Sequence, residues 1–266
     1  MIKKRNAWIA GIVSFFAPGL GHTYAGAPKL GWLIVACFIG AVFVGGTFGL
    51  FSTFYGILSF ALITLLFYVI LIASAVRRAR RNREYELQWF NRWYWYAAIL
   101  LLLSVGFQVL FAFRGPVLGY ETFRIPAASM APALQVGDFI TVNTRYRAPE
   151  LGDVVVFRWP VKPEISYVKR VAATGGDSVA IENGEVLVNG VPEEKLFVPP
   201  SNREKEFSEN MPEQQIPEGQ FFVLGDWRDN SNDSRFWGTV PVGNIVGKVT
   251  YIWLSNDPKR IGTHVR

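Results

Sequence analysis

Residues 31–76 read GWLIVACFIGAVFVGGTFGLFSTFYGILSFALITLLFYVILIASAV, and this stretch of 46 residues contains no charged side chain. It is too long for one membrane span, which takes about 20 apolar residues. A glycine-rich interruption at 45–49 divides it, so we predict two spanning helices, at about 31–50 and 54–76. Another uncharged run, residues 93–113, begins beside a cluster of Trp and Tyr that is typical of a membrane interface. The sequence therefore predicts three membrane-spanning α-helices in the first part of the chain.

A cluster of arginines, Arg77–Arg83, separates the second and third predicted spans. Short basic loops between spans generally face the cytoplasm, and we prefer this interpretation to a nucleic-acid-binding patch. We expect residues 1–119 to form a multi-pass domain in the plasma (inner) membrane and residues 120–266 to lie on its extracytoplasmic, periplasmic side. The first part has 11 Lys and Arg against two acids, whereas the second has 16 against 19. Anionic lipid headgroups are therefore the expected partner of the first part.

The segment before the first span, residues 7–24, has two interpretations. The basic residues Lys3-Lys4-Arg5 before it and Ala25-Gly26-Ala27 after it are typical of a cleavable signal peptide. However, Pro18 and Gly19 interrupt the region, and a proline would directly follow the cut. We therefore predict a short interfacial or re-entrant element, with its His22 in a structural role.

From residue 120 onward the sequence changes to short β-rich runs separated by turn residues. Strands are predicted at 139–142, 153–159, 167–172, 221–224 and 245–253, and Asn183-Gly184 predicts a hairpin between 179–181 and 185–188. We predict an all-β, barrel-like antiparallel domain. Residues 192–220 are rich in Glu, Pro, Asn and Gln and are expected to form an exposed excursion. Cys37 is the only cysteine, so no disulfide forms within the chain.

Three motifs in this second half contain residues with possible chemistry. They are RIPAASMAPAL (124–134) followed by VGDFI (136–140), YVKRV (167–171) followed by GGD (175–177), and GDWRDNSNDSRFWG (225–238). Taken alone, Ser129 is most simply a cap or turn serine, and Lys169 a solvated lysine on a strand. The acids of the third motif resemble half of a calcium loop, but Ser234 and Val240 stand where such a loop needs Gly and Glu. We therefore predict no metal site.

Together the three motifs resemble the type I signal peptidases, over roughly Phe123 to Trp253. The resemblance implies a membrane-bound serine endopeptidase that removes N-terminal signal peptides from exported precursors, with Ser129 as nucleophile and Lys169 as general base. A lysine can act as a base only when it is neutral, so its usual pKa of about 10.4 must be lowered, and burial has this effect. A Ser-His-Asp triad has little material here, because the chain has only two histidines, His22 and His264.

The resemblance also assigns supporting and substrate-binding residues. Ser231 would orient the lysine, and Asp233 and Arg235 would form a supporting ion pair. The residues expected to line shallow pockets that accept small side chains before the cut are Phe123, Ile125, Pro126, Ala127, Met130, Leu134, Ile140, Tyr167 and Val168. We expect no cofactor and no nucleic acid; the expected partners are signal-peptide-bearing precursors, the lipid bilayer and the secretion machinery.

The sequence departs from the family pattern beside the serine. Many relatives have Ser-Gly where this chain has Ala127-Ala128, so the backbone N–H of Ser129 is the one donor that we can assign to an oxyanion. Two alternatives to a general leader peptidase stay open: a specialised relative that processes one or a few partners, which the multi-span first half favours, and a non-catalytic protein that binds export partners. The retention of Ser129, Lys169, Ser231, Asp233 and Arg235 argues against the second.

Overall fold

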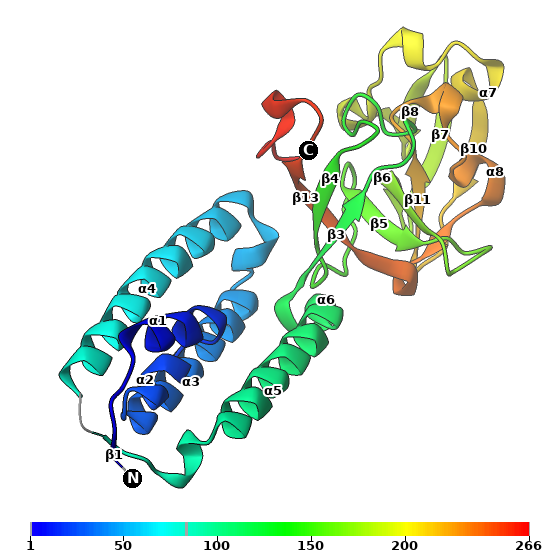
Figure 1. Ribbon diagram of the computed structural model, residues 1–266. Coiled ribbons are helices and arrows are strands. Elements are labelled where there is room, and N and C mark those ends of the chain that lie inside the picture. The colour runs from blue at the N-terminus through cyan, green and yellow to red at the C-terminus, as the bar shows by residue number, and fades with distance from the viewer. Residues whose placement is uncertain (1, 83–84, 266) are drawn as a thin grey trace. The chain divides into compact units, whose positions relative to one another are not determined.

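The computed structural model describes residues 2–82 and 85–265, and the chain divides into two compact units. One unit is helical and comprises Met1–Phe51 and Tyr55–Leu118; the other is rich in β-structure and comprises Ser52–Phe54 and Gly119–Arg266 (Figure 1). Arg83, the last arginine of the predicted basic loop, lies outside the described residues.

The helical unit contains a helix at each of the three predicted positions. The long helices are α3 (Pro28–Thr47), α4 (Phe54–Arg81) and α5 (Trp93–Ala112); the shorter ones are α1 (Ala7–Phe16), α2 (Leu20–Tyr24) and α6 (Arg114–Leu118). By length and composition, α3, α4 and α5 are the three described helices that could cross a membrane. Helix α4 continues beyond residue 76 into the arginine cluster, since arginine is a good helix former and cations suit a helix C-terminus.

Residues 7–24 form α1 and α2, joined by a turn in which Gly19 has a φ of 84°. The two helices pack closely at Gly21, where an added Cβ would meet Ser14 Oγ at 1.9 Å. His22 is buried, and its Nε2 lies 2.7 Å from Ser74 Oγ of α4. This contact between helices agrees with a structural role for the histidine.

The β-rich unit contains two antiparallel sheets. The larger has the strand order β12-β11-β6-β5-β13-β4-β3, and the smaller has the order β10-β7-β8-β9. The strands of the larger sheet are β3 (Tyr120–Arg124), β4 (Phe139–Asn143), β5 (Val154–Arg158), β6 (Ser166–Thr174), β11 (Gln220–Leu224), β12 (Val240–Pro241) and β13 (Ile245–Leu254). Those of the smaller sheet are β7 (Ser178–Glu182), β8 (Glu185–Val188), β9 (Val191–Pro192) and β10 (Met211–Gln215).

The predicted strands and the antiparallel pairing are confirmed, but the barrel-like domain that the sequence predicts does not close into a barrel. The hairpin turns at Asn183-Gly184, both with positive φ, and Glu182 pairs with Glu185. The larger sheet stays open, because no pairing of β3 with β12 closes it among the described residues. Strand β12 has only two residues, and Pro241 has no N–H with which to extend the ladder.

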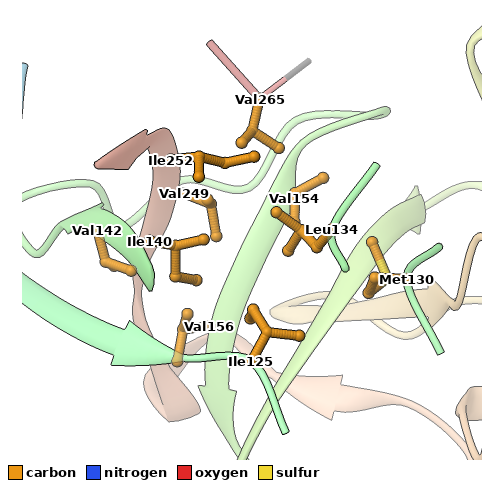
Figure 2. Close-up of a cluster of buried hydrophobic side chains, with 10 residues drawn as sticks. All are labelled: Ile125, Met130, Leu134, Ile140, Val142, Val154, Val156, Val249, Ile252 and Val265. Carbon is orange, nitrogen blue, oxygen red and sulfur yellow. The ribbon is translucent and has the colours of Figure 1, made fainter. Parts of the chain in front are cut away.

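One apolar core joins strands of the larger sheet to the segment that follows Ser129, and Figure 2 shows its side chains, among them Met130 and Leu134. Met130 and Leu134 of this segment are 2% and 0% exposed and pack with Ile140, Val156 and other strand residues. The chain immediately after Ser129 is thus fixed by burial of its own apolar side chains.

The segment 192–220 is only partly the exposed excursion that its composition predicts. It contributes β10 to the smaller sheet, and four of its apolar side chains are buried: Leu196, Val198, Met211 and Ile216. Leu196 and Val198 alternate with the exposed Phe197, but Met211 and Ile216 stand alone among polar residues, so the segment has no sustained period that would indicate their burial.

Candidate active site

Ser129 and Lys169, which are 40 positions apart, meet in the β-rich unit. Lys169 Nζ lies 2.6 Å from Ser129 Oγ. Lys169 belongs to β6, an inner strand of the larger sheet, and only 4% of the residue is exposed. Ser129 lies in the loop between β3 and β4, residues 125–138, which we call the Ser129 loop.

The Ser129 loop is closed at its base by the backbone. Ile125 N–H donates to Asp138 O at 2.8 Å, and Gly137 N–H donates to Ile125 O at 2.9 Å. A positive φ of 94° at Gly137 allows this tight return of the chain. Together with the buried Met130 and Leu134, these bonds define where Ser129 lies.

A second anchor of the loop comes from Arg260, near the end of the chain. Its guanidinium Nη2 donates to Asp138 Oδ2 at 2.7 Å and to Ala133 O at 2.8 Å. Burial alone would raise the pKa of Asp138, but hydrogen bonds from Arg260 and Ser255 outweigh it and hold the pKa below its usual value. The carboxylate therefore stays charged and keeps the loop attached to the C-terminal segment.

The environment of Lys169 disfavours its charged form. Burial lowers the pKa of this amine to about 8, with Asp233 and Asp226 opposing the change and Arg235 adding to it. Near pH 8 about half of the molecules then hold a neutral amine. A neutral Nζ can accept a hydrogen bond from the Ser129 hydroxyl and can take its proton.

Asp233 and Arg235 form an ion pair beneath the site. Arg235 Nε lies 2.8 Å from Asp233 Oδ1, and both side chains are almost fully buried. Asp233 Oδ2 also accepts the backbone N–H of Gly225 at 3.0 Å, and Arg235 Nη2 donates to Arg228 O at 2.6 Å. The pair thus holds together residues 225–238, which we call the Ser231 loop.

Ser231 is 6% exposed, and within the described ranges its hydroxyl has no hydrogen-bond partner. The orienting role that the resemblance assigns to Ser231 would need a hydrogen bond to Lys169, and this bond is not formed in this structure. Gly225 explains how close the two loops come, because a Cβ there would meet Ser231 Oγ at 2.2 Å and Ser129 O at 2.6 Å. Trp227 N–H also donates to Ser129 O at 3.1 Å.

An open cleft with a volume of about 720 Å³ contains Ser129, Lys169 and Ser231. Seven of the predicted substrate-binding residues line it: Phe123, Ile125, Pro126, Ala127, Met130, Tyr167 and Val168. Leu134 and Ile140 do not, because both are fully buried in the core beneath it. Asp233 and Arg235 also lie outside the lining.

Sequence reasoning missed part of the cleft wall. Ile165 and Ser166 precede the YVKRV motif, and Phe236 lies inside the third motif, yet all three line the cleft. Phe236 could have been identified as one of three aromatic residues in a largely polar motif. The described residues contain no cluster of three His, Cys, Asp or Glu that could hold a metal ion.

A serine hydroxyl in contact with a buried amine of lowered pKa, inside an open cleft, is an arrangement suited to a serine hydrolase in which lysine replaces histidine as the base. The comparisons with known proteins agree with this class. The family described as signal peptidase, peptidase S26, matches residues 92–254, and the chain belongs to this family. The resemblance found in the sequence is thereby confirmed.

Individual relatives of the chain are named signal peptidase I. Signal peptidase I of Pseudomonas aeruginosa is 39% identical, over 52% of this chain and 66% of that relative. Signal peptidase I of Aquifex aeolicus is 34% identical, over 51% of this chain and 76% of the relative. A crystal structure of a signal peptidase I from Enterococcus faecalis V583 is 28% identical, covers 40% of this chain and 99% of that chain, and has a TM-score of 0.33.

Proposed function

We propose that this protein is a membrane-bound serine endopeptidase that removes N-terminal signal peptides from exported precursors after small residues. The observation that carries the proposal is the 2.6 Å contact between Ser129 Oγ and the buried Lys169 Nζ. Membership of the signal peptidase family supports the substrate class. The lowered pKa of Lys169 supports its role as general base.

The proposed reaction has two halves. Neutral Lys169 accepts the proton of Ser129 as Oγ bonds to the carbonyl carbon at the cleavage site. The tetrahedral intermediate then collapses: its C–N bond breaks, and the Lys169 ammonium gives its proton to the departing amine. Water next attacks the ester on Ser129 and loses a proton to Lys169, which returns that proton to Oγ as the C–O bond of the ester breaks.

The backbone N–H of Ser129 is the donor that we assign to the developing oxyanion. Among the described residues it donates to no other acceptor, so it is free for this role. Ala127 lines the cleft but has no hydroxyl with which to assist.

The strand edges at the cleft suit an extended substrate. Pairing of β6 with β11 ends at Arg170 and Leu224, so Ser166–Lys169 continue past the end of β11. Strand β3 is an edge strand and leads directly into Ile125–Ala127 on the opposite wall. A substrate chain can therefore bond to main-chain groups on both walls while its side chains enter the apolar pockets.

The deciding experiment is cleavage of several signal-peptide-bearing precursors by the purified full-length protein, with each cut mapped by mass spectrometry. We expect cleavage after small residues, and its complete loss in Ser129→Ala with the melting temperature unchanged. Ser234→Ala would not serve as a control, because its hydroxyl accepts Val223 N–H in the core; the exposed Ser201 is suitable. Turnover by Ser129→Ala at the wild-type rate would contradict the mechanism.

One observation favours a specialised peptidase as a second candidate. Helices α1–α4 all precede residue 92, where the match to the family begins. A unit outside the matched region could select particular precursors. Cleavage of one precursor among many, with generic ones left intact, would support this candidate over a general leader peptidase.

A further inference from the structure

Residues 196–208 form a strap that lies against the Ser231 loop. The strap includes a 3₁₀ turn at Pro200–Asn202 and the start of α7 (Glu206–Glu209). Its hydrogen bonds to the loop join Leu196 O to Arg228 Nη2 at 2.8 Å, and the backbone N–H groups of Glu204 and Lys205 to the Asp229 carboxylate at 2.7 and 3.1 Å. The strap is thus bonded repeatedly to the loop that carries Ser231 and Asp233.

Asn202, at the centre of the strap, reaches both active-site loops with one amide group. Its Nδ2 donates to Ala131 O of the Ser129 loop and to Asp226 O of the Ser231 loop, each at 3.3 Å. Ala131 lies two positions after Ser129. Asn202 is half-buried. An amide nitrogen has two N–H groups, so Nδ2 can donate one hydrogen to each of these two carbonyls.

Among the described residues, the direct hydrogen bond between the two loops is made by backbone, from Trp227 N–H to Ser129 O. Asn202 differs because it belongs to neither loop and bonds to both. We infer that Asn202 is a positioning residue, which fixes the Ser129 loop against the Ser231 loop and so holds Ser129 in register with Lys169. The effect on catalysis rests on the proposed function, whereas the positioning of the two loops is independent of it.

Two physical consequences follow from loss of this bridge. A reacting group that moves by about 1 Å can lose a hundredfold in rate. In addition, the low pKa of Lys169 depends first on burial, with the charges of Asp233, Asp226 and Arg235 acting on it as well. Loosened loops admit water to the amine, and its pKa then returns toward the usual value.

The test compares Asn202→Ala with Ser201→Ala, an exposed neighbour in the same turn, in the full-length protein in detergent. We measure kcat and KM on a signal-peptide precursor, the melting temperature, and the titration of Lys169. The titration uses the pH dependence of dinitrophenylation by dinitrofluorobenzene, mapped to the Lys169 peptide, and so needs no peptidase activity. Asn202→Leu is the second variant, because it keeps a similar size, offers no N–H to the two carbonyls and adds no charge that could itself shift the pKa of Lys169.

For both Asn202 variants we expect kcat to fall by about tenfold or more, KM to stay within about twofold, and the Lys169 midpoint to move to higher pH. Ser201→Ala should match the wild type in every measurement. A fall in kcat without a matching change in KM or melting temperature, or a shift of the Lys169 midpoint, supports the positioning role. The inference is overturned if neither occurs. If the wild type cleaves no precursor, the proposed function fails. The titration of Lys169 alone then decides whether Asn202 has the positioning role.

Discussion

Lys169 is unusual among lysines because its amine is buried and its hydrogen-bond partner is a neutral hydroxyl, not a carboxylate. The side chain points from an inner strand, is 4% exposed, and has Ser129 Oγ as its hydrogen-bond partner. A full ion pair with Asp233 would have kept the amine charged, but that carboxylate is taken by Arg235 at 2.8 Å. Asp226, the other acid that acts on the lysine, is likewise paired with Arg170 at 2.7 Å, so burial decides the protonation state of the lysine.

Cleavage should depend on the protonation state of Lys169. In the proposed mechanism Lys169 must be neutral to act as the base, and its pKa is about 8, so kcat should rise about tenfold per pH unit below pH 8 and level off above it. The measurement is a pH profile of single-turnover cleavage, in which chemistry limits the rate. A profile that is flat from pH 6 to pH 10 would exclude Lys169 as the base.

Lys169→Met is the matched control for this profile. We also predict how its stability differs from that of the wild type at each pH. The folded pKa lies below the usual lysine value, so between about pH 8 and 10.5 the unfolded chain binds more protons and the free energy of unfolding rises with pH. Below pH 8 the folded protein carries the full cost of the buried ammonium, about 3 kcal/mol. Lys169→Met should therefore cleave nothing, melt at a higher temperature than wild type at pH 7, and lose that advantage near pH 10.

At the scale of elements, the Ser129 loop is held by parts of the chain that are distant in sequence. Arg260 belongs to a short 3₁₀ turn, Pro258–Arg260, yet it bonds to Asp138 and Ala133 more than 120 positions earlier. Asp138 is 1% exposed, and its charge is stabilised by this guanidinium, by the hydroxyl of Ser255 and by the backbone N–H of Gln135. The C-terminal segment is therefore part of the support for the site.

We predict that Arg260→Ala destabilises the β-rich unit by about 3 kcal/mol, because it leaves a buried carboxylate without its cation. The pKa of Asp138 should then rise, and stability should be lost at a higher pH on acidification than in wild type. Thermal unfolding at pH 5 and pH 8 measures both effects. Lys259→Ala, an exposed neighbour in the same turn, is the control. Equal melting temperatures for the two variants would contradict this account.

The sequence predicts elements better where their residues form a pattern. Strands β4, β5, β6, β11 and β13 were predicted because runs of Val, Ile and Phe are explicit. Strand β10 reads MPEQQ and was missed, since it has no β-branched residue and pairs with β7 at a bulge. In the site, the motifs identify Ser129 and Lys169, but Asn202 and Arg260 lie in polar segments without a motif. Their roles come from contacts at separations of 71 and 127 positions, which local patterns do not reveal.

At the scale of the whole chain, one contact bears on how the chain crosses the membrane. The connection between α3 and α4 includes Ser52–Phe54, which belong to the β-rich unit, and Thr250 Oγ1 donates to Ser52 O at 2.7 Å. The chain after α5 enters the same unit at Gly119. If α3, α4 and α5 each cross the bilayer, these two connections lie on one side, and the arginine-rich end of α4 lies on the other.

We therefore predict that the C-terminal end of α4 faces the cytoplasm and the β-rich unit faces the outside, since a basic connection favours the cytoplasmic side. The measurement is labelling of single cysteines by a membrane-impermeant maleimide in intact cells, in a Cys37→Ser background. Pro200→Cys, which is exposed, should be labelled in intact cells, whereas Arg80→Cys should be labelled only after the membrane is opened. Thr53→Cys reports on the α3–α4 connection and should behave as position 200 does.

Labelling of position 200 only after opening would put the cleft on the cytoplasmic side, away from exported precursors, and would overturn the proposed substrate class. Labelling of positions 53 and 200 from opposite sides would instead contradict the three-span arrangement, which places both connections on one side.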